Sequence, residues 1–181
     1  MGPPQVNFIN FVKQNHPEYF KNVNVVDFGA GDVNGNNRGF FLESNYIGID
    51  VFPGPNVDIV SKCHESPISP GAADVVITTE MLEHDPFWEQ SLTHMYNCLR
   101  ETGLLLVTCA TTGRGEHGTR RTTPWDSFAT RGNLTEFSDY YRNIDENDVK
   151  KIFQNYKFKK LEFFTTKFND LGVDLFFYAI K

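Results

Sequence analysis

Short apolar runs separated by polar segments recur along the first two-thirds of the chain. Runs of this length, bounded by Gly, Pro, Asn or Asp, are typical of the strands of a parallel sheet that is covered on both faces. Because the runs are mostly apolar and do not alternate strictly, both faces of the sheet are expected to be buried. The sequence predicts strands at residues 22–28, 45–50, 57–60, 73–79 and 103–110.

The best-marked helix is predicted from Asp85 to Gly103. Asp85 suits the N-cap, Pro86 suits the first turn, and Gly103 lies just past the last apolar position. Between them one apolar stripe recurs at helical spacing, so this helix is expected to cover the sheet. The stripe consists of Trp88, Leu92, Met95, Tyr96 and Leu99.

Two further helices are predicted, one on each side of this central region. Residues 5–15 are amphipathic and precede the first strand. Near the C-terminus, Asp145 suits an N-cap, with Ile144 and Val149 placed to pack on each other as a hydrophobic staple. The buried stripe of that helix is predicted to be Val149, Ile152, Phe153 and Tyr156.

The last part of the chain alternates in polarity, which predicts two strands, 158–168 and 173–181, joined at an "NDLG" turn. Strands that alternate with helices and end in a hairpin favour an α/β fold. We therefore expect a doubly wound, mostly parallel, Rossmann-like sheet with helices on both faces and an antiparallel C-terminal strand. Residues 1–181 are expected to form one domain.

Composition and charge narrow the classes of partner. The net charge of −6 disfavours nucleic acid, because nonspecific binding to phosphate backbones depends on positive charge. Three cysteines without a CxxC spacing indicate neither a disulfide framework nor a zinc knuckle. No apolar run reaches the ~20 residues that a membrane helix needs. A cytoplasmic protein without membrane or nucleic-acid partners is expected.

A glycine turn follows the first predicted strand, in "VVDFGAGDVNG" (25–35). In a doubly wound sheet this turn and the acid that ends the second strand, Asp50, share one crevice, where an acid suits ribose hydroxyls. A dinucleotide is disfavoured, because Gly35 comes one residue too late for GxGxxG and Asp27 would face a pyrophosphate. This disfavours an NAD-type oxidoreductase. A cationic nucleoside such as S-adenosylmethionine fits better.

Four successive segments resemble the motifs of class I S-adenosylmethionine-dependent methyltransferases of the type 11 family. They are "VVDFGAGDVNG", "YIGIDVFPGPNVDIV", "DVVITTEMLEHDPFWEQSLTHMYNCL" and "GLLLVTCATTGRGEHGTRRT", which together cover roughly residues 22–122. The order of the motifs is more specific than the glycine motif alone. The resemblance implies an enzyme of this class with S-adenosylmethionine as its cofactor.

The resemblance also implies cofactor-binding residues. Asp27, Gly29, Ala30 and Gly31 would cradle the methionine part, Asp50 would hold the ribose, Val51 or Phe52 would lie against the adenine, and Glu80 would lie close to the cofactor. Where the family commonly has an acid for the adenine amino group, this chain has Lys62, followed by Cys63 and His64. A lysine cannot accept that hydrogen bond, so adenine recognition is expected to use backbone groups or to be weaker than usual, with Cys63 and His64 as the candidate cofactor-binding residues there.

Residues 111–133 are polar, rich in arginine and too long for an ordinary connection, so they are predicted to form an acceptor-side loop. His117 is the first candidate for a general base, since histidine titrates near neutral pH, and His84 is the second. Glu83 and His84 suit a hydrogen-bond network at the start of a helix better than they suit catalysis. The substrate-binding candidates are Arg114, Arg120, Arg121 and Trp125.

The fourth strand ends in "TTEML" and lacks the "DPPY" or "NPPY" signature of amino-methylating nucleic-acid enzymes. This favours methylation of a small polar metabolite, with a sugar or sugar nucleotide as one candidate. In-line methyl transfer needs positioning and, for a hydroxyl acceptor, a base, so no metal is expected. A catalytically inactive cofactor-binding partner subunit is the alternative.

Overall fold

The computed structural model describes residues 1–181 and contains one seven-stranded sheet in the order β3-β2-β1-β4-β5-β7-β6. Every neighbouring pair is parallel except the two pairs made by β7, which runs antiparallel to β5 and to β6. This confirms the predicted fold class. The strands are β1 (Asn24–Phe28), β2 (Asn45–Asp50), β3 (Ile59–Val60), β4 (Ala73–Thr79), β5 (Leu99–Ala110), β6 (Lys160–Phe164) and β7 (Asp174–Ile180).

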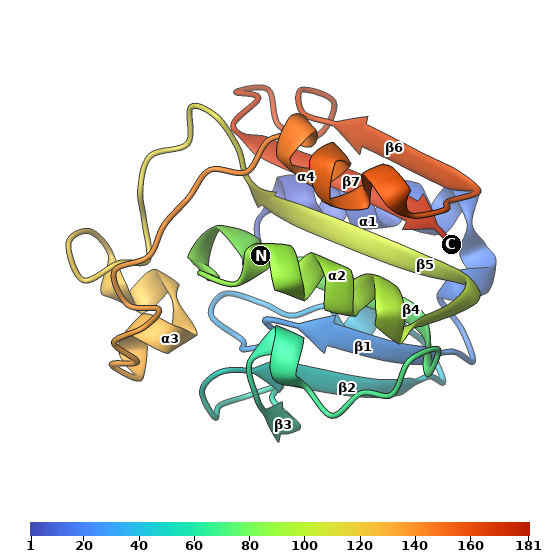
Figure 1. Ribbon diagram of the computed structural model, residues 1–181, viewed down its shortest axis with the longest axis horizontal. Helices are drawn as coiled ribbons and strands as arrows, with labels where there is room; N and C mark the ends of the chain where they lie inside the picture. The colour runs from blue at the N-terminus through green and yellow to red at the C-terminus, as the bar shows by residue number, and fades with distance from the viewer.

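Helices cover both faces of the sheet, with α2 and α4 on one face and α1 on the other (Figure 1). Adjacent residues of β1 point to opposite faces, so Val26 belongs to the core under α2 and α4 whereas Val25 belongs to the core under α1. The helices are α1 (Pro3–Asn15), α2 (Trp88–Cys98), α3 (Phe128–Arg131) and α4 (Glu146–Ile152).

The strand order reverses between the parallel strands β1 and β4, because the strand that follows β1 lies on one side of this pair and the strand that follows β4 lies on the other. β1 pairs with β2 on one side and with β4 on the other, so that Asp27 lies between Gly48 and Ile77. In sheets of this type the crevice at such a reversal, outside the carboxyl ends of the strands, is where ligands bind. The topology therefore brings the turn after β1 and the acid at the end of β2 to one edge.

The helix predicted from Asp85 to Gly103 is shorter than expected at both ends. The Asp85 carboxylate accepts hydrogen bonds from the Phe87 N–H at 2.8 Å and the Ser91 hydroxyl at 2.5 Å, and Phe87, not Asp85, is the N-cap. At the other end Leu99 pairs with Ala73 and starts β5. Strand pairing here overrides the helical spacing of Leu99.

The C-terminal predictions are confirmed with narrower bounds. Asp145 caps α4 and accepts a hydrogen bond from the Asp148 N–H at 2.9 Å, and both Ile144 and Val149 are fully buried in one cluster. The regular helix ends at Ile152, where a 3₁₀ turn over Phe153–Asn155 continues it. The predicted final hairpin is present as β6 and β7.

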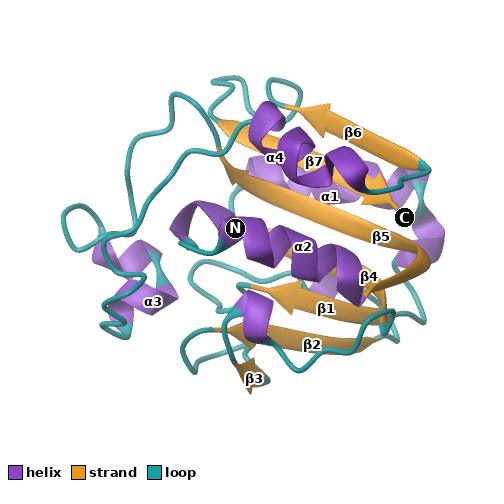
Figure 2. Ribbon diagram, in the orientation of Figure 1, coloured by secondary structure: helices purple, strands orange, loops and turns teal.

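The segment between β5 and α4 contains α3 and is otherwise mostly loop, and it extends beyond the end of the sheet (Figure 2). The three cysteines, Cys63, Cys98 and Cys109, are free and buried. None of the helices combines the length and the apolar character that crossing a membrane would require.

Candidate active site

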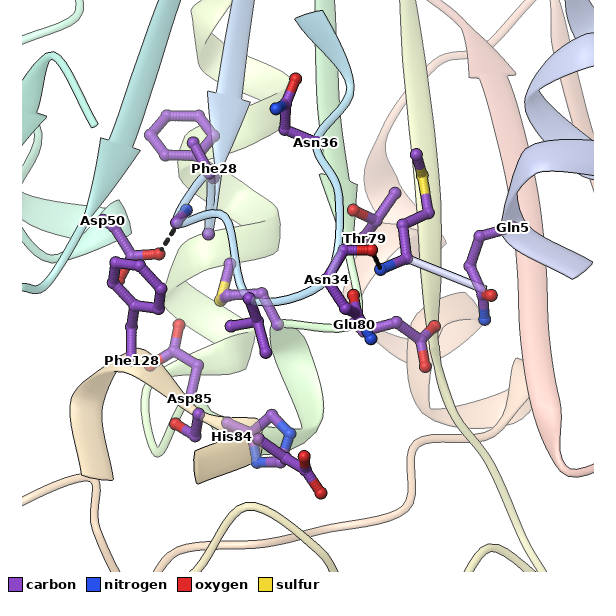
Figure 3. A pocket seen from close by; sticks show the side chains of 18 of the residues that line it. Gln5, Phe28, Asn34, Asn36, Asp50, Thr79, Glu80, His84, Asp85 and Phe128 are labelled. Carbon is purple, nitrogen blue, oxygen red and sulfur yellow. Dashed lines mark hydrogen bonds between the residues drawn. The ribbon is translucent and has the colours of Figure 1, made fainter. Parts of the chain in front are cut away.

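A cavity of about 530 Å³ lies at the carboxyl ends of β1, β2 and β4 (Figure 3). Most of the residues that the sequence predicts for cofactor and catalysis line it. Asp50 and Phe128 lie on one side of the cavity, and Glu80 and Gln5 lie on the other. The predicted residues in the lining are Asp27, Gly29, Ala30, Gly31, Asp50, Val51, Cys63, Glu80, His84, Arg114 and His117.

Four predicted site residues lie outside this lining. His64 packs its ring on Phe87, with the two ring centroids 4.5 Å apart. Arg120 and Arg121 form ion pairs on the surface, and Trp125 is 62% exposed. Contact of these three with an acceptor stays a prediction, as does contact of His64 with a cofactor.

The glycine turn after β1 has a backbone that only glycine adopts without strain. Gly29 has φ +76°, and a Cβ added there would lie 2.5 Å from the side chain of Met81. The Gly29 N–H donates to the Ile49 carbonyl at 2.8 Å, and the Gly31 N–H donates to the Asp50 carboxylate at 2.9 Å. The turn is thus held tightly against the end of β2.

Asp27 is a buried acid with unsatisfied hydrogen-bonding capacity. Its side chain is 1% exposed, and one oxygen accepts hydrogen bonds from the Asn37 amide at 3.1 Å and from the Tyr46 hydroxyl. The other oxygen is buried and has no partner. Burial raises the pKa of Asp27 to about 7, and only in part do these two hydrogen bonds counteract it. A cation or a hydrogen-bond donor would satisfy the free oxygen.

Asp50 organises the other side of the turn. In addition to Gly31, its carboxylate accepts a hydrogen bond from the Val51 N–H at 2.7 Å. Burial raises the pKa of Asp50 to about 6, and the backbone hydrogen bonds oppose this shift. The side chain lines the cavity and each carboxylate oxygen can accept more than one hydrogen bond, so ligand hydroxyls can be added to this arrangement.

The opposite side of the cavity is acidic. Glu80 accepts a hydrogen bond from the Thr108 hydroxyl at 2.8 Å, and burial together with the charge of Asp174 raises its pKa. Arg114 lines the cavity but pairs with the buried Asp174 at 2.6 Å. Asp174 also accepts hydrogen bonds from the amides of Gln5 and Asn169. The positive charge of Arg114 is therefore balanced by Asp174.

Two histidines meet next to this acidic region. The ring centroids of His84 and His117 are 4.9 Å apart, and the ring of Tyr141 lies 5.0 Å from that of His117. Burial, assisted by the positive charges of His117 and Arg114, lowers the pKa of His84 to about 3. His84 is therefore neutral at physiological pH and a weak base.

Comparison with protein-family models gives one match, which covers residues 7–162 and is described as a methyltransferase domain. The chain belongs to this methyltransferase family. The match extends well beyond the motifs on which the sequence-based resemblance rests, and it confirms that resemblance. A search of curated proteins gave no significant match.

Solved structures with the same fold are methyltransferases of low sequence identity. One is 1,6-didemethyltoxoflavin-N1-methyltransferase of Burkholderia thailandensis with its substrate and S-adenosylhomocysteine, at a TM-score of 0.66 and 16% identity, covering 98% of this chain and 78% of that one. Another is phosphoethanolamine N-methyltransferase 2 of Haemonchus contortus with S-adenosylmethionine, at a TM-score of 0.65 and 14% identity. This match covers 97% of this chain and 52% of that one. A third is a methyltransferase of Archaeoglobus fulgidus, at a TM-score of 0.59 and 15% identity. This match covers 98% of this chain and 94% of that one.

The cavity of this methyltransferase fits a cationic nucleoside. The free oxygen of Asp27 is a buried acceptor without a partner, and the space beside Gly29 is too small for any side chain. The free oxygen favours a ligand with a positive charge, whereas the space beside Gly29 is filled by the side chain of Met81. The preference for positive charge agrees with S-adenosylmethionine, the cofactor predicted from the glycine motif.

Cofactor binding to this methyltransferase should therefore strengthen as the pH rises through about 7. Asp27 is protonated below its pKa of about 7 and ionised above it, and only the ionised form attracts an ammonium group. We expect the dissociation constant for S-adenosylhomocysteine to increase by up to about tenfold for each pH unit below that pKa. Calorimetry between about pH 6 and pH 8 measures this. The Asp27→Asn variant should lose most of the pH dependence, and an unchanged dependence in that variant would exclude Asp27 as its source.

Several lining residues were not predicted for the site. Gln5 lies in α1, is buried and donates a hydrogen bond to Asp174. In the sequence it is only one polar residue of an amphipathic helix. Asn37 follows the glycine turn in a polar segment with no periodicity. Asp174 opens β7 and resembles an ordinary strand-terminal acid. No local pattern distinguishes these residues, because their proximity is created by the sheet.

Proposed function

We propose that this methyltransferase binds S-adenosylmethionine in the cavity at the carboxyl ends of β1, β2 and β4 and methylates a small polar acceptor. A sugar or sugar nucleotide is one candidate. The observation that carries the proposal is the two-sided lining of one cavity. The side at Asp27, Gly29 and Asp50 suits a cationic nucleoside, and the side at Glu80 and His117 offers groups that bind or deprotonate a polar acceptor.

On the cofactor side, the chain's own groups supply the binding energy and the orientation. Asp27 offers its free oxygen to an ammonium group, and the backbone of Gly29 and Gly31 lines the cavity beside it. Asp50 accepts hydrogen bonds from ribose hydroxyls. When bound, the cofactor supplies an electrophilic methyl group on a sulfonium ion.

On the acceptor side, the chain holds and deprotonates the incoming group. The Glu80 carboxylate and the Arg114–Asp174 pair offer hydrogen bonds to a polar molecule. The Nδ1 atom of His117 lies 3.1 Å from the Gly115 carbonyl, which can only accept, so Nδ1 carries the proton and Nε2 is free to take one. A cavity of about 530 Å³ suits a cofactor with a small acceptor.

The solved neighbours support a small acceptor without naming it. The Burkholderia enzyme has bound 1,6-didemethyltoxoflavin, and the Haemonchus enzyme is named for phosphoethanolamine, so the same fold serves chemically different small molecules. This chain spans about half the length of the Haemonchus protein. The acceptor class proposed here therefore rests on the lining of this chain's cavity.

The Asp50→Ala variant should bind S-adenosylhomocysteine about 1–3 kcal/mol more weakly than the wild type, because buried hydroxyls would lose a charged acceptor. Calorimetry measures the difference. Asp58→Ala is a matched control, since Asp58 also accepts a backbone hydrogen bond in this region, from Gly48 at 2.7 Å, but does not line the cavity. Equal binding by Asp50→Ala and the wild type would refute the ribose role of Asp50.

A further inference from the structure

Glu83 is a fully buried carboxylate without a hydrogen-bond partner. Its side chain is 0% exposed, and neither of its oxygens makes a hydrogen bond of normal geometry. Burial and the negative charge of Glu80 raise the pKa of Glu83 well above its ordinary value, and the backbone amides of Glu83 itself and of Ala110 only partly oppose this shift. Leaving such a group unpaired costs free energy, so its persistence calls for a partner.

The imidazoles of two histidines, His84 and His117, lie next to the unpaired Glu83 carboxylate. One ligand-type atom from each of Glu83, His84 and His117 can be chosen so that all three lie within 4.8 Å of one another. The Nδ1 atom of His84 is buried and has no hydrogen-bond partner. A Cβ added to Gly118 would lie 2.6 Å from the His84 ring, so the loop that carries His117 packs closely on His84.

The orientation of His117 is fixed in a way that is typical of a metal ligand. Its Nδ1 donates to the Gly115 carbonyl, as described above, which directs the lone pair of Nε2 elsewhere. Metal-binding histidines usually donate their second ring nitrogen to a backbone carbonyl or a carboxylate in this manner. The sequence suggests an alternative, a hydrogen-bond network at the start of the helix. In such a network the Glu83 carboxylate would accept hydrogen bonds, but neither of its oxygens has a partner.

We propose that Glu83, His84 and His117 bind a divalent transition-metal ion. Two imidazoles and one carboxylate form the ligand set of catalytic zinc sites and of non-haem iron sites, in which further coordination positions stay open. This ligand set favours Zn²⁺, Fe²⁺ or Co²⁺ over Mn²⁺, Mg²⁺ or Ca²⁺, which prefer oxygen ligands. From the sequence no metal is expected, because in-line methyl transfer needs only positioning and a base, and the distance of Glu83 and His84 from His117 along the chain gives no sign of a shared site.

The surrounding charges favour a cation at this position. Glu80 and Asp174 contribute negative charge near Glu83, and Arg114, which opposes a metal, is already paired with Asp174. His84 and His117 line the cavity and Glu83 does not. The inference rests on the proposed function in one respect: with the ion bound, His84 and His117 would act as ligands and an open coordination position would be available to an oxygen of the acceptor, whereas without the ion Nε2 of His117 is free to act as the base.

Binding of Co²⁺ to chelator-treated, tag-free protein tests the proposal without any acceptor. We expect one Co²⁺ per chain, with visible d–d absorption bands, and displacement by Zn²⁺. His117→Ala and Glu83→Gln should each weaken binding by at least about 100-fold, since the loss of a direct ligand exceeds the 10–100-fold effect of outer partners. His16→Ala is the matched control, because His16 interacts with Tyr178 and does not line the cavity.

Circular dichroism and binding of S-adenosylhomocysteine are measured on each variant to show that it is folded. Equal Co²⁺ binding by the wild type, His117→Ala and Glu83→Gln, or no stoichiometric binding by the wild type, would overturn the proposal. A wild-type protein that binds S-adenosylhomocysteine but no metal would overturn the metal site alone. A protein that binds metal but no S-adenosylhomocysteine would leave the metal site standing and contradict the proposed function.

Discussion

The His117→Ala variant is expected to lower turnover by about 10²–10⁴-fold, the usual contribution of a positioned acid–base group. Of the two imidazoles in the cavity, His117 is better suited to take a proton, because burial lowers the pKa of His84 to about 3. His117 contributes nothing to the side of the cavity at Asp27 and Asp50. The dissociation constant for S-adenosylhomocysteine should therefore change by less than about twofold.

Turnover is measured as S-adenosylhomocysteine production with an acceptor found by screening small polar molecules. His16→Ala, which alters a histidine outside the cavity, should keep wild-type turnover. Glu83→Gln separates the role of His117 as a base from its role as a metal ligand. The variant removes another ligand of the proposed metal site and leaves the His117 imidazole in place. If His117→Ala turned over like the wild type, the acceptor would have to be deprotonated elsewhere. A protein that binds the cofactor but methylates no acceptor in the screen would favour the inactive partner subunit.

The Gly29→Ala variant is expected to lose roughly 2–5 kcal/mol of folding stability. A left-handed backbone costs a residue with a Cβ about 1–2 kcal/mol, and overpacking adds about 1–3 kcal/mol. At Gly29 both apply, since φ is +76° and the new Cβ would lie 2.5 Å from Met81. Displacing Met81 would also narrow the cavity, so binding of S-adenosylhomocysteine should weaken in parallel.

Gly71→Ala is the matched control for the backbone contribution. Gly71 has φ +73°, but a Cβ there would meet no atom within 4 Å, so only the strain of about 1–2 kcal/mol is expected. Denaturant unfolding of both variants measures the loss of folding stability from strain alone in Gly71→Ala and from strain plus overpacking in Gly29→Ala. Equal losses for Gly29→Ala and Gly71→Ala would show that the turn after β1 relaxes around a side chain and is not a rigid cradle.

The fold could be predicted from the sequence because its signals are local. Apolar runs mark the strands, and the Asp145 cap and its Ile144–Val149 staple mark a helix whose own residues fix its start. The α2 helix was predicted too long at both ends, because Asp85 bonds Phe87 and Ser91 and because Leu99 pairs with Ala73. The Asp85 hydrogen bonds are local, but apolar spacing does not show them, and the pairing of Leu99 with Ala73 depends on tertiary structure.

The lining of the cavity at the glycine turn and Asp50 could also be predicted, since both lie in consecutive strand–turn units. The lining on the other side could be predicted only in part. The loop 111–133 was recognised by its length, but its Phe128 packs on Gly31 and Gly54 near Asp50, on the side of the cavity opposite Glu80 and Gln5. The cluster of Glu83 with His117 joins two distant segments, and no sequence pattern links them.

Isothermal titration calorimetry of the wild-type protein with S-adenosylhomocysteine, S-adenosylmethionine, NAD and NADP tests the cofactor assignment most directly. We expect heat of binding with one site per chain for the first two ligands and none for the dinucleotides, because Asp27 attracts an ammonium group and repels a pyrophosphate. Tight binding of NAD without a response to S-adenosylhomocysteine would contradict the assignment of this cavity to a methyl donor.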